Sequence, residues 1–547
     1  MARQRPSLSL GQSDFAALRG EERVYVDKSA YFAKLRRFGW TLSLARPDGF
    51  GKSLLMSALD AYFSGEKGLF RGLAAARTLD DPDFQPFSVL NFDLSLKGGA
   101  RRRSLPKRLL ELVQSCAARH GARLREKSFA PAVVELAEKV ARRGGREIVI
   151  LVDSYDEPMT RALARGLRRG DEEAAWRAQE TLREFFGALR RVEALTAFRM
   201  VAGTTSSAWL EDSADFEACD VSAEEEFAGL CGFDSQEIRR YFAPHLKDAS
   251  REMKIGSREL VALVERRYGG FAFDGKKRVA RPLSVLKFLR RKKCGDFWKE
   301  RTRDGLIRGF FAKNARPVDF FHGESVEGRF ARRPTDILLA DPLGFLYQTG
   351  FLTLRARPEG AFVLQYPNLE VYARVSALFL EKARGRAESE TRADARALRE
   401  ALAQGDVAAL GDLLRAFFAE LAESPFAQAL IKFDRERFHH FCVKAFLAEA
   451  GFPARRGDHF ERDGWDFVIA FPEVATAIKI FVAREGEDWE TLARSGFKGS
   501  PNLGELEGTA RRALFYAREG RVALDARATL PGGAREAEEG EEDGQLA

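Results

Sequence analysis

The sequence predicts an α/β fold built on a parallel sheet that carries a phosphate-binding loop, and two stretches support this prediction. The first, Thr41–Ser53, has the character of a short apolar strand, a tight turn with two glycines, and the start of a helix. The second, Glu147–Asp153, is a continuous apolar run that ends in an acid. A strand buried on both faces of a parallel sheet has this composition. We therefore expect both stretches to belong to one parallel sheet.

The loop between the first strand and its helix has the residue types that hold phosphate. Backbone N–H groups and the positive end of the helix face the anion, Lys52 reaches the outer phosphates, and the Ser53 hydroxyl ligates Mg²⁺. Gly49 and Gly51 supply the turn. The standard motif begins with a glycine where this chain has Arg46. Because Gly-Lys-Ser also starts ordinary helices, the tripeptide alone does not establish a phosphate-binding site.

Two strand ends are predicted to complete the site. Asp153 is expected at the carboxyl edge of the sheet, where it would hold Mg²⁺ through water. The alternative is an ordinary surface aspartate that caps a buried strand. A further apolar strand, Phe198–Thr205, ends in hydroxyl residues, and Thr204 or Thr205 would suit as the sensor of the γ-phosphate. A plain transition from strand to loop explains those hydroxyls equally well.

The remaining pattern predicts further strands and helices around this sheet. Phe87–Asp93 reads as a strand, and a long basic helical region covers residues 104–143 before two glycines. Asp234 begins a capped helix, and Ser257–Tyr268 is an amphipathic helix stopped by another glycine pair. The sequence of residues 401–421 predicts a further helix.

Composition limits the class of protein. The 547 residues are enough for two to four domains. No apolar run approaches the ~20 residues that cross a bilayer, and the N-terminus has no apolar segment of a secretory signal. The five cysteines show neither metal nor redox spacing, which favours a reducing compartment. We therefore expect a cytoplasmic protein without a membrane partner. The net charge of +8 is compatible with nucleic acid but does not require it.

Several short motifs follow the pattern of a known family. They are Leu10–Phe15, Tyr25–Ser29, Arg46-Pro47 followed by Phe50–Ser53, and Leu69–Leu73. They resemble the bacterial AAA-ATPase-like family, in which a divergent P-loop ATPase domain precedes a PD-(D/E)XK nuclease-like domain. Members commonly have Arg-Pro-Arg-Arg-Phe-Gly-Lys-Ser/Thr in the loop, so arginine at position 46 is a family trait. The resemblance implies ATP and Mg²⁺ as ligands.

The resemblance also implies a domain organisation and a set of site residues. It divides the chain into a P-loop AAA-ATPase-like domain (1–240), a helical lid with a winged-helix-like extension (241–384), and a PD-(D/E)XK nuclease-like α/β domain (385–530). Residues 531–547 are acidic and glycine-rich, a composition that predicts disorder. The predicted cofactor-binding residues are Arg46, Gly49, Gly51, Lys52, Ser53 and Thr204; the predicted metal ligands are Ser53, Asp153 and Asp466; the predicted catalytic residues are Asp153, Asp156, Asp466 and Lys479.

The ATPase site departs from the family at one acid. Similar proteins usually read Asp-Glu-Tyr-Asp where this chain has Asp-Ser-Tyr-Asp over residues 153–156. Ser154 therefore replaces the glutamate that would polarise the attacking water, and serine cannot take that proton at neutral pH. Asp156 or Glu157 could substitute, and the sequence leaves their placement open.

The nuclease-like region departs in a similar way. Asp466 and Lys479 fall where the family has an aspartate and a lysine, but the position two residues before the lysine, usually glutamate, is Ala477. Residues two apart lie on the same face of a strand, so the metal pocket lacks a carboxylate. The alternative is that Asp466 and Lys479 form an ordinary cross-strand surface pair. A helix is expected around Leu506–Tyr516.

These observations predict an ATP-binding P-loop protein with weak or absent hydrolysis, coupled to a degenerate, inactive nuclease-like domain. The alternative is a non-catalytic module that is gated by nucleotide and binds a partner or nucleic acid. Whether the chain is an enzyme, and whether its partner is nucleic acid, another protein or a second copy of itself, stays open at this stage.

Overall fold

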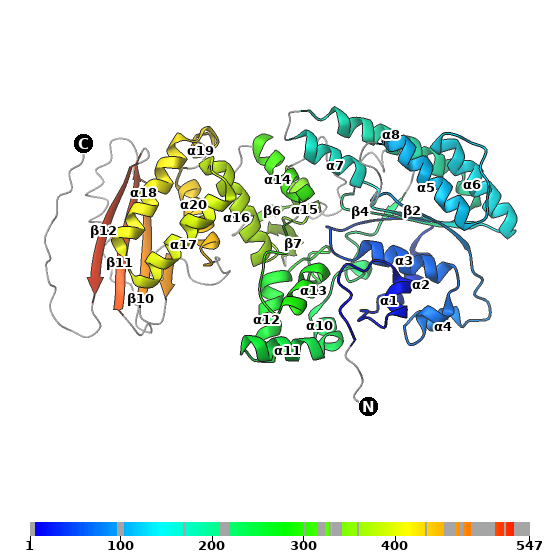
Figure 1. Ribbon diagram of the computed structural model, residues 1–547, viewed down its shortest axis with the longest axis horizontal. Helices are drawn as coiled ribbons and strands as arrows, with labels where there is room; N and C mark the ends of the chain where they lie inside the picture. Colours follow the sequence, from blue (N-terminus) through cyan, green and yellow to red (C-terminus); the bar gives the residue numbers. More distant parts are fainter. Residues whose placement is uncertain are drawn as a thin grey trace. The chain divides into compact units, whose positions relative to one another are not determined.

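Figure 1 shows the computed structural model, which divides into two units. Unit 1 comprises Met1–Phe310 and Phe320–Arg374, and unit 2 comprises Phe311–Asp319 and Val375–Ala547. The structure describes residues 6–529 except for 96–102, 168–170, 207–217, 300, 314–322, 328–329, 331–341, 358–359, 433–434, 453–466, 471–473, 483–508 and 519–520. Among the helices of these described residues, none has the length and apolar character needed to span a bilayer.

Unit 1 is built around a five-stranded sheet in the order β2-β3-β4-β1-β5, and every neighbouring pair is parallel. Its strands are β1 (Thr41–Ala45), β2 (Ser88–Asp93), β3 (Ile148–Asp153), β4 (Thr196–Gly203) and β5 (Cys219–Asp220). All six residues of β3 are buried, as expected for a central strand covered on both faces. The predicted α/β fold with a parallel sheet is therefore confirmed.

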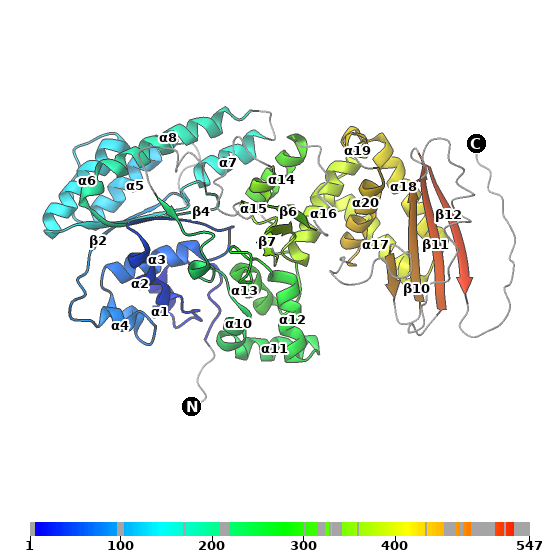
Figure 2. The same cartoon turned by 180° about the vertical axis from the view of Figure 1, so that it is seen from behind.

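Helices cover both faces of this sheet, as Figures 1 and 2 show from opposite sides. One face carries α1 (Phe15–Gly20), α2 (Phe32–Phe38), α3 (Lys52–Phe63) and α4 (Ala76–Leu79), and the other carries α5 (Leu105–Arg119), α6 (Phe129–Gly144), α7 (Glu157–Gly166) and α8 (Glu173–Arg191). The predicted basic helical region is thus two helices, because the chain turns at Gly121, whose φ is +62°. The predicted stop is confirmed, since Gly145 caps α6 in the left-handed conformation.

A group of four helices follows β5, and these helices share an apolar core of their own. They are α10 (Ser235–Tyr241), α11 (Ala243–Met253), α12 (Ser257–Tyr268) and α13 (Pro282–Arg291). The predicted cap at Asp234 is confirmed as a capping box with Glu237. The bounds of α12 agree with the predicted helix. Buried side chains from every helix of the group, such as Phe242, Val264 and Phe288, pack together.

The rest of the described part of unit 1 consists of a small antiparallel sheet, two helices and the start of a longer helix. The sheet has the order β6-β8-β7, with β6 (Glu324–Val326), β7 (Thr353–Ala356) and β8 (Phe362–Gln365), and the neighbouring helices are α14 (Arg301–Lys313), α15 (Pro342–Gln348) and α16 (Leu369–Arg384). The buried Arg374 guanidinium of α16 makes a two-point ion pair with Asp304 of α14, at 3.0 Å from Nε to Oδ1 and 2.6 Å between the outer atoms. This pair fixes the first turns of α16 against α14.

Glu370, in the first turn of α16, is a buried carboxyl group with two defined hydrogen bonds. Its Oε1 accepts from the backbone N–H of Phe297 at 2.5 Å, and its Oε2 accepts from the Ser284 hydroxyl at 2.8 Å. Burial raises the pKa of Glu370 to about 7, although the nearby Arg281 charge and the two hydrogen bonds oppose this rise. The folded protein therefore retains this proton at pH values where the unfolded chain has lost it.

We expect Glu370→Gln to remove a pH dependence of stability between pH 4.5 and 7. Below pH 4.5, the ordinary pKa, the carboxyl is protonated in both states and its contribution is complete. As the pH rises towards 7, only the unfolded chain ionises, so the wild type loses on the order of 3 kcal/mol of stability from this group. Urea unfolding of both proteins at pH 4.5, 6 and 8 measures the difference. If the difference in unfolding free energy between wild type and Glu370→Gln is the same at all three pH values, Glu370 does not have the raised pKa.

Unit 2 begins with helices and ends with a second sheet. The helices after α16 are α17 (Glu388–Gln404), α18 (Val407–Glu423), α19 (Pro425–Ile431) and α20 (Arg435–Glu449). The prediction of one helix over residues 401–421 is wrong at its start. Gly405, with φ +65°, ends α17, and the Asp406 side chain accepts from the Ala409 N–H to begin α18.

The sheet of unit 2 has the order β12-β11-β10-β9, with β9 (Phe467–Ala470), β10 (Val474–Val482), β11 (Thr509–Arg518) and β12 (Arg521–Thr529). β9 and β10 form an antiparallel pair. The expected helix around Leu506–Tyr516 is wrong, because this segment supplies β11, which pairs with β10 on one side and β12 on the other. Asp466 lies outside the described residues. Lys479 lies in β10 opposite Leu514, and Ala477 lies opposite Val468.

Candidate functional site

The strand order brings three functional strand ends to one edge of the sheet in unit 1. β4 lies between β1 and β3, and its register pairs Gly203 with Ala45 and Ala202 with Asp153. The chain leaves β1 towards β2 at one end of the sheet and leaves β4 towards β5 at the other. β1 and β4 therefore form a topological switch point, where open α/β sheets bind their ligands.

The loop that follows β1 has the backbone shape of a phosphate cradle. Gly49 and Gly51 adopt φ values of +82° and +98°, and Gly51 is the N-cap of α3. A β-carbon on Gly51 would meet no atom within 4 Å, so the loop faces open space there. The buried Phe50 ring anchors the loop between these glycines by packing edge-on against Phe271 and Phe273. Ser53 lies in the first turn of α3, as predicted.

Lys52 is folded back onto its own loop. Its side chain is only 7% exposed, and Nζ donates to the carbonyl oxygen of Arg46 at 2.6 Å and to that of Pro47 at 3.3 Å. The Asp48 carboxylate lies 3.6 Å from the same nitrogen. Charge-assisted bonds to phosphate are stronger than bonds to neutral carbonyls, so these loop carbonyls can give way to phosphate oxygens.

Asp48 links the loop to the end of β4. Its Oδ1 accepts from the Thr204 hydroxyl at 3.1 Å, in addition to the ion pair with Lys52. The sequence alone does not single out Asp48, although one signal was available. The loop of the family that this chain resembles has two arginines where this chain has Asp48 and Gly49. An acid thus replaces a base beside the lysine that would bind phosphate.

The segment after β3 turns sharply back towards β4. Asp153 is buried at the end of β3, and Ser154 has a φ of +56°, which is uncommon for a residue other than glycine. The Tyr155 N–H donates to Ala202 at 3.1 Å, and its hydroxyl donates to the Thr205 carbonyl at 2.6 Å. Position 154 therefore lies in a constrained turn that directly follows Asp153.

Asp156 clamps the end of β4. Its buried carboxylate accepts from the N–H of Thr204 at 3.0 Å, from the N–H of Thr205 at 2.9 Å and from the Thr205 hydroxyl at 2.8 Å. Burial raises the pKa of Asp156, while these donors and the Lys52 charge oppose that rise. Its neighbour Glu157 forms an ion pair with Arg161 on the same helix. The carboxylate of Asp156 thus positions Thr204 beside the loop.

The Arg46 side chain points away from the cradle. Its guanidinium donates to the carbonyl oxygens of Ala45 and Ser222 at 2.8 Å each, and it lies 4.0 Å from the centre of the Phe273 ring. It is 1% exposed, so its charge is enclosed by protein. Arg46 therefore supports the loop from behind, and only its backbone carbonyl contacts Lys52.

The chain's own groups fit a magnesium nucleotide in most respects. Two left-handed glycines, a buried ammonium, and hard oxygen donors at Ser53 and Asp153 are the groups that phosphate and Mg²⁺ require. The Asp48 carboxylate is the group that opposes an anion. The arrangement brings together Asp48, Lys52, Asp156 and Thr204, and it separates the Arg46 side chain from them.

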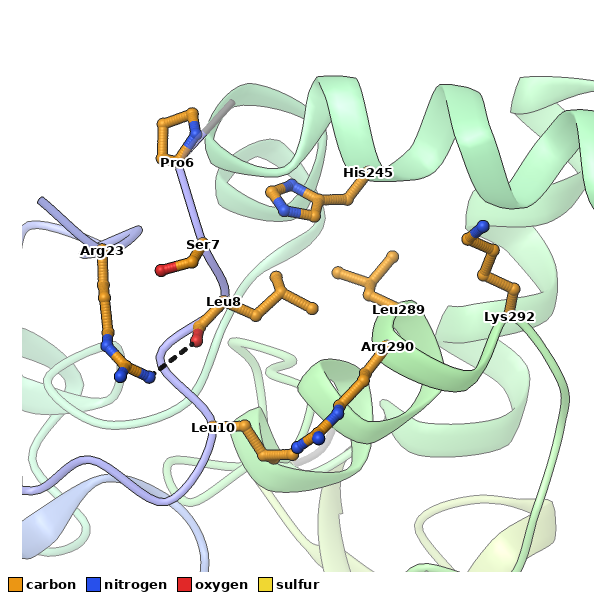
Figure 3. Close-up of a pocket in the computed structure, with 9 residues that line it drawn as sticks. All are labelled: Pro6, Ser7, Leu8, Leu10, Arg23, His245, Leu289, Arg290 and Lys292. Carbon is orange, nitrogen blue, oxygen red and sulfur yellow. Dashed lines mark hydrogen bonds between the residues drawn. The ribbon is translucent and has the colours of Figure 1, made fainter. Parts of the chain in front are cut away.

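A cavity of about 470 Å³ lies elsewhere in unit 1, between the N-terminal segment and the helices α11 and α13 (Figure 3). Apolar side chains such as Leu8 and Leu289 and the basic Arg23 and Lys292 line it. The two bases are ion-paired with Glu21 and Glu252, and Arg23 also donates to the Leu8 carbonyl. The bond from Arg23 to Leu8 ties the N-terminal segment to the neighbouring loop, and the cavity is separate from the switch point.

Comparison with known proteins agrees with the geometry of unit 1. Residues 9–209 match the family model described as "Predicted AAA-ATPase". This AAA-ATPase-like region contains α1, the loop, and strands β1 to β4. A protein of Azotobacter chroococcum mcd 1, described as an uncharacterized protein in the vnfD 5′ region, is 26% identical over 426 residues. That alignment covers 76% of this chain and 78% of the relative, so the similarity extends beyond the AAA-ATPase-like region.

Proposed function

We propose that the AAA-ATPase-like region binds ATP with Mg²⁺ at the loop of residues 46–53 and hydrolyses it slowly or not at all. Lys52 and the loop N–H groups would hold the phosphates, and Ser53 and Asp153 would hold the metal, which supplies charge neutralisation on the phosphates. Thr204 would contact the terminal phosphate. The observation that carries this proposal is the buried Lys52 ammonium inside a left-handed glycine loop at a topological switch point.

The proposal of weak hydrolysis rests on the segment after β3. Ser154 cannot accept a proton from water at neutral pH, Glu157 is paired with Arg161, and the Asp156 carboxylate accepts three hydrogen bonds from the end of β4. Neither neighbouring acid is therefore available as a strong base. This supports a nucleotide-controlled switch over a fast ATPase.

We expect Ser154→Glu to raise ATP hydrolysis at least tenfold over a wild-type rate near background. A positioned general base contributes about 10²–10⁴-fold. The constrained left-handed turn at position 154 limits how a new side chain can be placed, so we expect only part of this gain. Ser154→Gln is the matched control, since it has the same size without the base. Phosphate release with saturating Mg·ATP measures the rate. Wild-type turnover that equals that of Ser154→Glu would show that Ser154 is no defect.

For unit 2 we propose a nuclease-like fold that lacks nuclease activity. The antiparallel pairing of β9 and β10 supports it, because the family's metal pocket forms on such a hairpin. Ala477 in β10 supplies no carboxylate two residues before Lys479. Incubation of the full chain with DNA and Mg²⁺ should leave the substrate intact, and metal-dependent cleavage abolished by Lys479→Ala would overturn this proposal.

A further inference from the structure

The backbone of the phosphate loop is held from behind by three donors that lie outside the AAA-ATPase-like region. Arg281 Nε donates to the Asp48 carbonyl at 2.8 Å, the N–H of Leu283 donates to the Gly49 carbonyl at 3.2 Å, and the N–H of Gly232 donates to the Phe50 carbonyl at 3.2 Å. Three consecutive carbonyl groups of the loop therefore point towards the segments around residues 232 and 281–283.

These bonds determine where the loop N–H groups point. In a trans peptide, the C=O of one residue and the N–H of the next are on opposite sides. When the carbonyls of Asp48, Gly49 and Phe50 face backwards, the N–H groups of Gly49, Phe50 and Gly51 face the other way. Phosphate loops bind their anion through such successive N–H groups. The three donors therefore preset the loop for an anion before any ligand arrives.

The supporting segments are themselves tied together. Phe233 and Ala280 exchange both backbone hydrogen bonds, at 3.0 and 2.7 Å, so Gly232 and Arg281 are adjacent to one antiparallel bridge. Gly49 allows the closest approach, because a β-carbon there would lie 2.7 Å from Arg281 Nε. Any side chain at position 49 would therefore collide with the Arg281 guanidinium behind the loop.

Arg281 is positioned in turn by the start of α16. It is 1% exposed, and its outer nitrogen donates to the Phe297 carbonyl at 2.8 Å and to the Ser284 hydroxyl at 3.2 Å. That hydroxyl donates to Glu370, which also accepts from the Phe297 N–H. A continuous set of hydrogen bonds thus joins the first turn of α16 to the phosphate loop through Ser284 and Arg281.

We propose that Arg281 is a positioning residue that holds the loop N–H groups ready for phosphate, and that Glu370 on α16 controls this hold through Ser284. This regulation rests on the proposed function, because it acts on the affinity of the same loop for nucleotide. Loss of the bond between Glu370 and Ser284 leaves Arg281 held by the Phe297 carbonyl but without a fixed Ser284 hydroxyl, so the loop is held less firmly in its preset shape. The affinity for nucleotide then falls because binding must also order the loop.

Two variants and one control test the proposal. Arg281→Lys keeps the charge but loses the planar fork of donors, Ser284→Ala removes only the hydroxyl link, and Arg290→Lys changes an exposed arginine on the same helix. The first measurement is hydrogen exchange of the loop amides in residues 46–55 without nucleotide. We expect exchange about tenfold faster in Arg281→Lys and about threefold faster in Ser284→Ala, with no change in Arg290→Lys.

The second measurement separates this inference from the proposed function. If the wild type binds Mg·ATP, we expect the Kd to rise about tenfold in Arg281→Lys and not at all in the control. If the wild type does not bind ATP but the exchange difference persists, the proposed function fails and the support of the loop by Arg281 stands. Unchanged exchange in both test variants overturns the inference. If Arg281→Lys fails to fold, the Ser284→Ala exchange result alone decides.

Discussion

Replacing Lys52 by alanine is expected to weaken the binding of Mg·ATP about 100-fold, which corresponds to about 3 kcal/mol. The Lys52 ammonium is buried inside the loop, and its present partners are mainly two carbonyl oxygens of that loop. Charged hydrogen bonds in such an enclosed site contribute about 1.5–3 kcal/mol each. Equilibrium titration with a fluorescent ATP analogue in the presence of Mg²⁺ measures the change.

Lys67→Ala is the control for this experiment, because Lys67 is an exposed lysine in a short turn outside the site. It should bind as the wild type does. Thermal unfolding of Lys52→Ala should stay close to that of the wild type, since the carbonyl partners become accessible to water. An unchanged affinity in Lys52→Ala would mean that the nucleotide, if it binds, binds elsewhere.

Asp48→Asn is expected to strengthen ATP binding about tenfold at low salt. The Asp48 carboxylate lies 3.6 Å from the Lys52 ammonium and accepts a hydrogen bond from Thr204, so it competes with phosphate for both groups. Two unit charges about 4 Å apart interact by about 1 kcal/mol in water and by more near protein, and a triphosphate carries several charges. Because Asp48 is half-exposed, solvent partly screens the repulsion between its carboxylate and the phosphates. We therefore expect a gain in affinity of about tenfold and no more.

Salt provides the diagnostic for Asp48. Raising the ionic strength should narrow the difference between wild type and Asp48→Asn, since screening shortens the reach of exposed charges. Glu180→Gln, which removes an exposed acid of α8, is the control with the same change in net charge. Weaker ATP binding in Asp48→Asn would instead assign the carboxylate to the metal or to the loop's own structure.

The parts of the fold that were predictable from the sequence depend on local chemistry. β3 is recognisable because five buried apolar residues in a row, followed by Asp153, are typical of a strand covered on both faces. The helix at Ser257–Tyr268 has both its apolar stripe and its glycine stop. β11 was not recognisable as a strand from the sequence. Its pairing with β10 and β12 is non-local, and such pairing overrides weak local preference.

The candidate site was predictable only where a motif names the residue. Lys52 and Ser53 follow from Gly-Lys-Ser, and the placement of Thr204 follows from a strand that ends in hydroxyls. The roles of Asp48 and Arg281 could not be predicted. Asp48 contacts Thr204, which lies 156 positions later in the chain, and Arg281 contacts Asp48 across a separation of 233 positions. Arg46 matches the motif of the resembling family, yet its side chain contacts Ser222 behind the loop.

The most direct test of the central claim is hydrogen exchange of the wild-type chain with and without saturating Mg·ATP. If the loop after β1 is the phosphate site, the peptide covering residues 46–55 should show the largest slowing of exchange anywhere in the protein. Smaller slowing is expected at the ends of β3 and β4, where Asp153 and Thr204 lie. Bound nucleotide that leaves exchange in residues 46–55 unchanged would contradict the assignment of this loop as the ATP site.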